Sequence, residues 1–257
     1  MNIEQPLVSI ITPAYNSARF IHEAIESVLA QTYTNWEMII VDDCSTDDTM
    51  EIVQTYAEKD ARIKLYQLEE NSGSGVARNR AMDESQGRFI AFLDSDDVWM
   101  PEKLTRQMAF MLDNGIAFSF TKYVRMHEDG TVTDAITEAP ATVEYDNLMK
   151  HCVIGCLTVM LDRSKIGEQR MLEIRTRQDY AFWLTLTRQG FNAYGLPEVL
   201  AKYRLVENSI SSNKLKAAKQ NWRLYYEIED QPLWKSIWYF VNYAFTSTKN
   251  IIKFRLK

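Results

Sequence analysis

The chain has 257 residues, of which 46% are hydrophobic and 25% charged, and its formal net charge is −6. This composition excludes extensive disorder, and the length suits one large α/β domain with or without a tail. General nucleic-acid binding needs a basic surface, so the net negative charge argues against it. The three cysteines lack C-x-x-C spacing, which argues against a disulfide scaffold and for a reducing compartment.

Two further classes are disfavoured by local features of the sequence. The three histidines are scattered and do not form a zinc-ligand pattern. The first residues contain neither a basic region nor a long apolar stretch, so we expect no signal peptide.

The first half of the chain alternates between strand-like and helix-like hydrophobic periods. Short apolar runs predict strands at residues 7–11, 37–41, 63–66 and 88–93. Helical spacing predicts helices between them, at residues 20–29, 45–56 and 73–82. Alternation with such short connections predicts an α/β fold with a doubly wound, mostly parallel, Rossmann-like sheet. The first strand is followed by no glycine-rich turn, which counts against a dinucleotide-binding dehydrogenase.

The second half is less regular. We expect strands at residues 117–124 and 199–204, a hairpin turn at 128–131 and a helix at 178–188. From Lys214 onward the pattern is helical, and residues 125–175 carry the weakest pattern.

The fourth predicted strand ends in three carboxylates within four positions, those of Asp94, Asp96 and Asp97. Crowded carboxylates repel each other, and hard oxygen ligands suit Mg²⁺ or Mn²⁺. Open α/β sheets bind ligands at the carboxyl ends of their strands. The segment therefore predicts a divalent metal that holds a phosphorylated ligand. The alternative is a solvated acidic loop at the start of the helix that Pro101 opens.

Five segments, in chain order, resemble those of the inverting glycosyltransferases of family 2, which have the GT-A fold. They are VSIITPAYN at 8–16, SVLAQT at 27–32, IVDDCSTD at 40–47, ARN at 77–79 and FLDSDD at 92–97. Later segments, RQDYAFWL at 177–184, YR at 203–204 and NSIS at 208–211, resemble the subgroup that builds bacterial surface polysaccharides such as teichuronic acid, O-antigen and capsule. Each segment alone is weak, but the ordered set is specific.

The resemblance implies how a nucleotide is bound. Pro13 and Tyr15 are expected around the nucleobase, and Asp43 is expected to accept the imide N–H of uracil, because a carboxylate can only accept hydrogen bonds. Core packing of Tyr15 and helix capping by Asp43 are the alternatives. Asn79 is grouped with the nucleotide contacts, with helix capping or packing as its alternative. Asp94 is expected near the ribose.

The resemblance also implies the chemical roles. Asp96 or Asp97 is expected to ligate the metal that bridges the diphosphate, with the division between them left open. Asp179 is the expected general base for the acceptor hydroxyl, and its alternative role is a helix cap. Many relatives have Glu-Asp where this chain has Gln178-Asp179. Arg204 and residues 209–214 are expected to form a lid near the diphosphate, with a surface charge on an edge strand as the alternative.

Residues 233–257 form a basic aromatic tail. This segment has five basic side chains and no acid, so the rest of the chain carries −11. Its apolar run is too short and too interrupted to span a bilayer, but tryptophan and tyrosine with flanking lysine suit a helix in the membrane interface. The alternatives are a helix packed on the catalytic domain or a contact in a homo-oligomer.

The resemblance implies an enzyme that moves a sugar from a UDP-sugar to a hydroxyl of a lipid-linked glycan with inversion. It would act at the cytoplasmic face of the inner membrane. Residues 1–212 are expected to form the catalytic domain, with a nucleotide-binding half at 1–100 and an acceptor half at 101–212, and residues 213–257 a helical tail. The alternatives are a nucleotidyltransferase and a catalytically inactive nucleotide-sugar-binding or scaffold protein.

Overall fold

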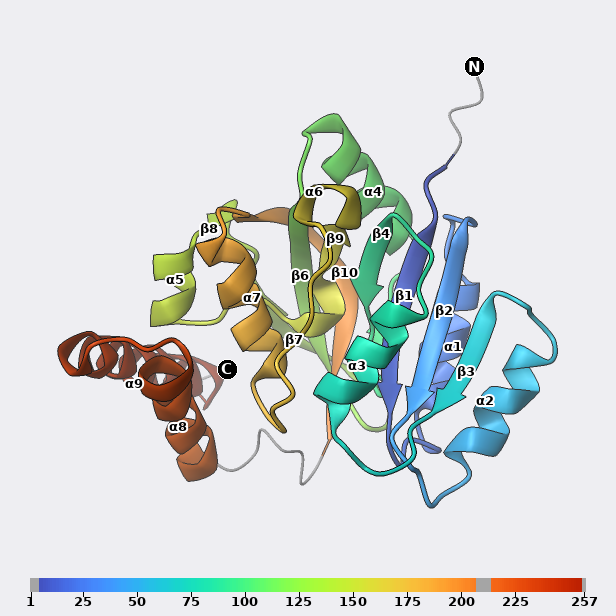
Figure 1. Ribbon diagram of the computed structural model, residues 1–257, viewed down its shortest axis with the longest axis horizontal. Coiled ribbons are helices and arrows are strands. Elements are labelled where there is room, and N and C mark those ends of the chain that lie inside the picture. Colours follow the sequence, from blue (N-terminus) through green and yellow to red (C-terminus); the bar gives the residue numbers. More distant parts are fainter. Residues whose placement is uncertain (1–4, 207–213, 256–257) are drawn as a thin grey trace.

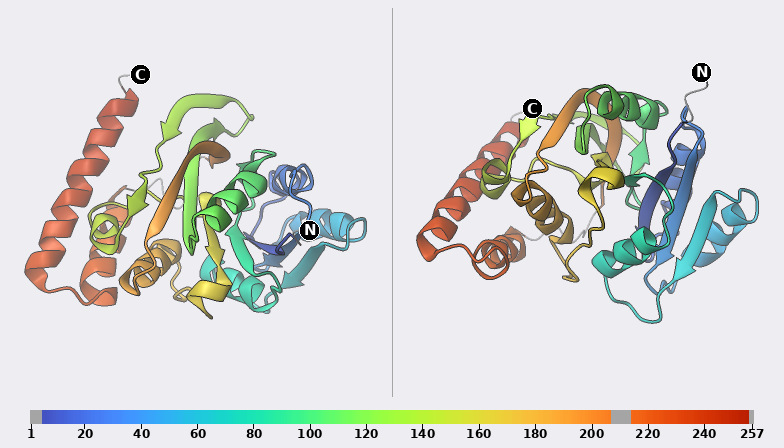
Figure 2. Two further views of the ribbon diagram at one scale, coloured as in Figure 1. Left: turned by 90° about the horizontal axis from the view of Figure 1, so that it is seen from above. Right: turned by 45° about the horizontal axis from the view of Figure 1, so that its top comes forward.

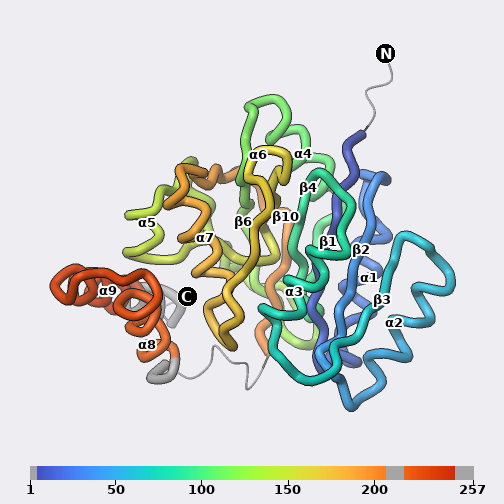
Figure 3. Tube along the Cα trace, viewed as in Figure 1, coloured from blue at the N-terminus to red at the C-terminus, as the bar shows by residue number. Residues whose placement is uncertain are grey.

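Within the residues that the computed structural model describes, 5–206 and 214–255, a ten-stranded mixed sheet crosses the molecule, and helices cover both of its faces (Figure 1). Side chains are described for residues 5–206 and 217–246. The path of the chain runs from the parallel half of the sheet to a pair of C-terminal helices at the opposite end (Figure 3).

The first half has the predicted α/β winding. Its strands are β1 (Val8–Ala14), β2 (Trp36–Asp42), β3 (Ile63–Gln67) and β4 (Phe89–Phe92). They are parallel and lie in the order β3-β2-β1-β4. The helices between them are α1 (Ile21–Leu29), α2 (Thr49–Ala57) and α3 (Ser74–Asp83). This order reverses at β1 and β4, so their carboxyl ends form the expected position for a ligand.

The second half completes the sheet with strands of both directions. The strands are β5 (Val98–Trp99), β6 (Phe118–His127), β7 (Val132–Thr137), β8 (Thr142–Val143), β9 (Met160–Asp162) and β10 (Ala193–Leu205). The helical elements are α4 (Lys103–Asp113), α5 (Tyr145–Lys150), the 3₁₀ turn η1 (Cys156–Thr158), α6 (Arg163–Ile166) and α7 (Gln178–Arg188). β9 is antiparallel to β4 and β6, whereas β10 is parallel to β6.

Alternation along the central strands divides the core into two layers. Ile11 and Ile39 face a cluster that includes α3 and α7, whereas Ile10 and Met38 face a cluster formed with α1, α2 and α4. Trp183 of α7 is fully buried in the first layer and contacts three phenylalanine rings at centroid distances of 5.3–5.5 Å. Because residues i and i+2 share a face of a strand, this apolar alternation fixes the register of the sheet.

The C-terminal helices pack at the end of the sheet opposite β3 (Figure 2). They are α8 (Lys214–Arg223), the π-helical turn η2 (Leu224–Ile228) and α9 (Leu233–Arg255). Tyr225 is fully buried in the same core layer as Trp183, and the Tyr239 hydroxyl donates to Asp146 at 2.9 Å. The C-terminal segment therefore begins as part of the core, which agrees with the packed-helix alternative for this part of the segment. Among the described helices, none is long and apolar enough to cross a membrane.

Replacement of Trp183 by alanine tests this packing. The Trp183→Ala change removes a fully buried indole from the junction of α7 and β4. We expect the free energy of unfolding to fall by about 3–5 kcal/mol, because the remaining side chains only partly fill the cavity. Chemical denaturation measures the change. The control Leu112→Ala, at an exposed position of α4, should stay within about 0.5 kcal/mol of the parent.

Candidate active site

The loops that follow β1, β2 and β4 meet at the carboxyl edge of the parallel strands. The Ser17 and Ser95 hydroxyls are hydrogen-bonded at 2.7 Å, which joins the β1 loop to the β4 loop. The Asn16 side-chain carbonyl accepts from the Thr46 amide at 2.8 Å, which joins the β1 loop to the β2 loop. Asn16 has a positive φ of 47°, a conformation that asparagine tolerates better than most residues. These bonds hold the three loops as one platform.

A cavity of about 420 Å³ opens beside this platform. Asp94, predicted near the ribose, and Asp96, predicted as a metal ligand, line it together with Asp179 of α7. The other lining residues are Ser74, Arg78, Arg175, Thr176, Arg177, Gln178, Tyr203, Val206, Ala217 and Gln220. The fold thus brings together carboxylates that lie more than 80 positions apart in the sequence.

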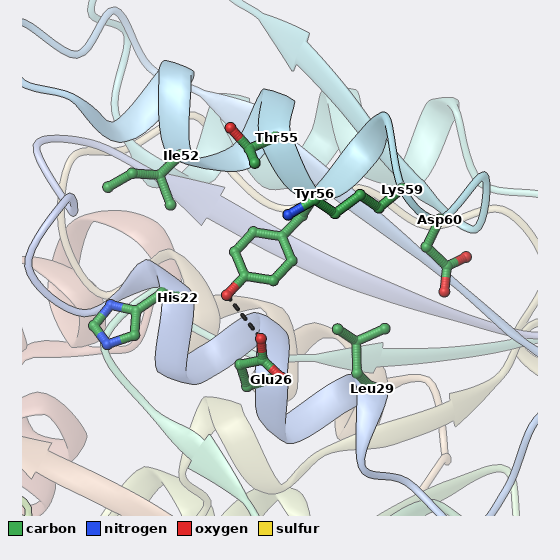
Figure 4. Close-up of a pocket in the computed structure, with 8 residues that line it drawn as sticks. All are labelled: His22, Glu26, Leu29, Ile52, Thr55, Tyr56, Lys59 and Asp60. Atoms are coloured by element: carbon green, nitrogen blue, oxygen red, sulfur yellow. Dashed lines mark hydrogen bonds between the residues drawn. The ribbon is translucent and has the colours of Figure 1, made fainter.

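A second cavity of about 670 Å³ lies on the outer surface between α1 and α2 (Figure 4). Tyr56 and Glu26 bridge it with a hydrogen bond of 2.8 Å. Although it is larger, it lies away from the carboxyl edge of the sheet and contains none of the predicted site residues. We therefore assign the chemistry to the cavity beside Asp94 and Asp179.

Arg78 of α3 lines the cavity and forms an ion pair with Asp94. Its side chain is almost fully buried, and its Nη2 donates to the Asp94 carboxylate. Its Nε and Nη1 find no partner among the described residues. Buried guanidinium groups normally use all their donors, because an unmade hydrogen bond is costly. Arg78 therefore has two nitrogen donors that could bind a ligand in the cavity.

Asp96 and Asp97 point to different surroundings. Asp96 lines the cavity, and burial together with the neighbouring Asp94 carboxylate raises the pKa of Asp96 to about 6. Asp97 is 1% exposed, and its carboxylate accepts a hydrogen bond from the Arg204 amide at 2.9 Å. Burial, together with the charges of Asp96 and Asp94, raises the pKa of Asp97 well above its usual range. Asp97 does not line the cavity, so the geometry does not place it as a ligand. No cluster of three or more His, Cys, Asp or Glu side chains suited to a metal occurs among the described residues.

Arg204 is placed differently from its predicted contact with a diphosphate. The side chain is fully buried, with Nε donating to the Asp96 carbonyl at 2.7 Å and Nη2 to Glu23 at 2.7 Å. Its guanidinium also lies 4.4 Å from the centroid of the Phe20 ring. In this structure Arg204 holds the Asp94–Asp97 loop and does not face the cavity. Most of the lid predicted at residues 209–214 lies outside the described residues.

Asp179 stands in the first turn of α7, where the positive helix end faces the cavity. Its carboxylate accepts no hydrogen bond within the described part of the chain, so it is open to a substrate. The preceding Gln178 donates to the Ser74 hydroxyl at 2.6 Å and ties α7 to α3. Arg177 has a left-handed φ of 65°, which is uncommon for arginine and typical of functional sites.

The predicted nucleotide contacts divide into exposed and structural residues. Tyr15 is 50% exposed at the end of β1, which excludes the core-packing alternative, and Pro13 is buried in the strand. The Asp43 carboxylate accepts the amides of Ser72 and Gly73 at 2.7 and 2.8 Å. Gly73 adopts a φ of 96°, which favours glycine, and it precedes α3. Asp43 therefore orders the turn before α3, and each of its oxygens keeps a lone pair for a further bond.

Asn79 packs away from the cavity. It is 2% exposed, and its amide donates to the Met171 carbonyl at 2.9 Å and accepts the Met171 amide at 2.8 Å. In this structure both polar side-chain atoms of Asn79 hold the segment that leads to α7, which agrees with the packing alternative.

The sequence did not assign roles to the three arginines on the cavity. Arg78, Arg175 and Arg177 line it, and Arg175 donates twice to Asn71 at 3.0 Å. Arg175 belongs to the weakly patterned region at 125–175, and Arg78 and Arg177 were quoted only within motifs. Their local sequence gave no sign of the cavity that the fold forms around them.

Comparisons with known proteins decide the family. The family model described as glycosyl transferase family 2 matches residues 9–204, which include all the cavity-lining residues except three at the C-terminal end. The chain belongs to glycosyltransferase family 2. It is thus a glycosyltransferase of the GT-A fold, as the sequence motifs predicted.

Two curated relatives cover nearly the whole chain. It is 54% identical over 98% of both chains to TuaG of Bacillus subtilis, a glycosyltransferase named for teichuronic acid biosynthesis. It is 40% identical, over 95% of this chain and 94% of the relative, to WfgD of Escherichia coli. WfgD is named as a UDP-Glc:α-D-GlcNAc-diphosphoundecaprenol β-1,3-glucosyltransferase. This chain is similar to both along nearly their whole length.

A solved structure shares the fold. The mannosyltransferase PcManGT from Pyrobaculum calidifontis, in complex with GDP-Man and Mn²⁺, aligns with a TM-score of 0.68. The alignment covers 90% of this chain and 66% of that one at 18% identity. This similarity supports the GT-A architecture of the chain.

Replacement of Arg204 tests its observed role. Arg204→Gln breaks the buried ion pair with Glu23 and the bond to the Asp96 carbonyl. We expect the free energy of unfolding to fall by about 2–3 kcal/mol, less than for a fully buried pair because Glu23 keeps some contact with water. Because Arg204 holds the Asp94–Asp97 loop, the folded variant should lose part of its UDP affinity together with its stability.

Chemical denaturation and calorimetry with UDP separate the two roles. The matched control, Arg170→Gln, removes an exposed pair with Asp83 and should change stability by less than about 1 kcal/mol. Unchanged stability with a large loss of UDP affinity would restore Arg204 as a diphosphate ligand.

Proposed function

We propose that this glycosyltransferase moves one sugar from a UDP-sugar to a hydroxyl of a lipid-linked glycan with inversion at the anomeric carbon. It would thereby serve the synthesis of a bacterial surface polysaccharide. One observation carries the proposal: a single cavity at the carboxyl edge of the sheet is lined by Asp94, Asp96 and Asp179. The names of TuaG and WfgD support the process and the acceptor class.

Asp179 is the proposed general base. An acceptor hydroxyl becomes a good nucleophile when its proton is removed as the new bond forms. Asp179 has a carboxylate that is open to the cavity and is held in place by the first turn of α7. Attack by the hydroxyl on the face opposite the leaving nucleotide gives a single displacement and hence inversion. Gln178 fixes this turn to α3 through Ser74 and does not itself carry charge.

The nucleotide is proposed to lie on the platform formed by the β1, β2 and β4 loops. Tyr15 offers an exposed ring for the base, next to Pro13 at the end of β1. Asp43 is proposed to use its remaining lone pair for the uracil imide. Asp94, held by Arg78, is proposed near the ribose. The UDP donor named for WfgD supports uracil as the base.

A divalent cation, Mg²⁺ or Mn²⁺, fits beside Asp96. The support is the chemistry of the donor atoms: the carboxylates of Asp94 and Asp96 face one cavity, and hard oxygen ligands suit these ions. Asp96 is the carboxylate placed to hold the ion, and Asp97 supports the loop from behind. When bound, such a cation stabilises the negative charge that develops on the leaving diphosphate. The Mn²⁺ named for PcManGT agrees with an ion in this fold.

Arg177 is the proposed cationic contact for a diphosphate, in place of Arg204. Its side chain lines the cavity and makes no hydrogen bond within the described residues. A guanidinium suits phosphate because its planar donors form paired hydrogen bonds. Arg177 has a left-handed backbone conformation and stands two positions before Asp179, at the start of α7.

The alternatives fit the cavity less well. A nucleotidyltransferase normally has a glycine-rich basic loop after the first strand, whereas β1 is followed by Tyr15 and Asn16. A binding protein without catalysis needs no open carboxylate, yet Asp96 and Asp179 share the cavity. The free state of Cys44, Cys152 and Cys156 agrees with a reducing compartment, and we propose action at the cytoplasmic face of the inner membrane.

Removal of the proposed base should separate binding from turnover. We expect Asp179→Asn to lower kcat by about 10²–10⁴-fold, the range for a lost general base. UDP affinity should stay close to that of the parent. Steady-state transfer assays and calorimetry make the measurement, with the exposed Glu173→Gln as the matched control. Loss of donor affinity with unchanged turnover of bound donor would make Asp179 a binding residue.

The metal proposal predicts a response to chelation. Transfer should stop in excess chelator and return with Mg²⁺ or Mn²⁺. Asp96→Asn should weaken UDP binding when the ion is present and have little effect when it is absent. Calorimetry with and without chelator measures this difference. Full activity in excess chelator would rule out an essential ion.

A further inference from the structure

One face of α9 is apolar and exposed. Its side chains remain 48–72% accessible although the helix is attached to the domain, and they are Leu233, Trp234, Ile237, Trp238, Val241 and Phe245. These positions follow helical spacing and form one continuous stripe along the helix. Single exposed apolar residues are common on proteins, but a row of six including two tryptophans marks an interaction surface.

The opposite face of α9 packs on the domain, so the apolar stripe faces outward. Ser236 is fully buried and Tyr239 is 6% exposed against the domain. The rings of Tyr239 and Tyr225 lie 6.0 Å apart, and the Phe240 ring meets Trp222 of α8 at 5.8 Å. One face of α9 is therefore packed on the domain, as the packed-helix alternative expects. The other face carries the exposed apolar stripe.

We infer that the α9 stripe docks on an anionic lipid surface. The inference rests on the proposed lipid-linked acceptor, because such a substrate keeps its glycan within reach of the membrane. The stripe provides the apolar contact, and Trp234 and Trp238, one turn apart, are side chains that favour the bilayer interface.

The charge of the segment complements anionic head groups. Residues 233–257 contain five basic residues and no acid, whereas the rest of the chain carries −11. Lys235 borders the stripe, and its ammonium lies 5.6 Å from the centroid of the Trp234 ring. Lys249 and Lys253 stand 14 and 18 positions after Lys235, which corresponds to about four and five helical turns. At helical spacing these three positions recur on one side of α9.

The same charges disfavour a second copy of the chain as the occupant. A two-fold dimer through this face would place two identical basic tails against each other. A lipid surface with anionic head groups instead attracts each basic residue within a Debye length.

The position of α9 relates the surface to the active site. α9 contacts α5 and α8, and α8 contributes Ala217 and Gln220 to the wall of the active-site cavity. The long helix lies at the end of the molecule away from β3 and the nucleotide platform (Figure 2). Docking through α9 therefore leaves the donor side free and brings the acceptor side toward the membrane.

Vesicle binding by the full chain tests the inference. The probes are vesicles of phosphatidylcholine alone and of phosphatidylcholine mixed with phosphatidylglycerol. We expect co-sedimentation with the anionic vesicles, weakened by added salt, and quenching of tryptophan fluorescence by brominated lipid. Trp234→Gln with Trp238→Gln should lower the partition coefficient by about tenfold or more, because each exposed indole loses favourable transfer.

Matched variants separate the stripe from general surface effects. Leu112→Gln, at an exposed apolar position on α4, should bind vesicles as the parent does. Lys235→Gln should reduce binding to anionic vesicles only. The double tryptophan variant should keep its transfer rate on a water-soluble diphosphate acceptor and lose rate on the same acceptor with a long lipid in vesicles.

The outcomes distinguish this inference from the proposed function. Transfer to the soluble acceptor without vesicle binding would overturn the docking surface and leave the proposed function intact. Vesicle binding without transfer to either acceptor would support the surface and contradict the proposed function. Dimers in sedimentation analysis that dissociate in the double variant, with no vesicle binding, would assign the stripe to a second copy and overturn the inference.

Discussion

The active site depends on holding three carboxylates together at the end of one strand. Asp94, Asp96 and Asp97 repel each other, so the loop that carries them needs cationic or hydrogen-bonding support. Arg78 donates to the Asp94 carboxylate from α3, and Arg204 donates to the Asp96 carbonyl and, through its amide, to Asp97. Two buried arginines from different parts of the chain thus hold the loop in one conformation and leave Asp96 on the cavity. The negative charge that remains there suits this edge to a cation, and such a cation would in turn hold a diphosphate.

Much of the fold was predictable because its first half repeats a simple pattern. The strands β1 to β4 are buried, short and separated by helices, so hydrophobic period and connection length determine a parallel winding. The second half was only partly predictable. The turn at 128–131 indicates the hairpin of β6 and β7, whereas β8 and β9 are short and pair with strands far away in the sequence. No local period reports such pairing. The fold class follows from the sequence, but the position of the antiparallel strands follows only from tertiary packing.

The sequence predicted the kinds of residue in the candidate site better than the contacts that these residues make. Asp96 and Asp179 were expected to act together, and they line one cavity. Asn79 and Arg204 belong to matching motifs, yet the structure uses Asn79 to bind Met171 and Arg204 to hold the carboxylate loop. A motif reports that a residue type is needed, whereas burial and hydrogen bonds decide which atoms it contacts. The tail shows the same limit, since Tyr239 and Trp238 are neighbours in sequence and face opposite environments.

A single base that acts opposite the leaving nucleotide, as proposed for Asp179, implies inversion at the anomeric carbon. The most direct measurement is the anomeric configuration of the glycan product, read from the proton coupling constant by nuclear magnetic resonance, after transfer from an α-linked UDP-sugar to a diphosphate-linked acceptor. We expect a β linkage from the α-linked donor. An α linkage in the product would contradict single displacement and the role assigned to Asp179.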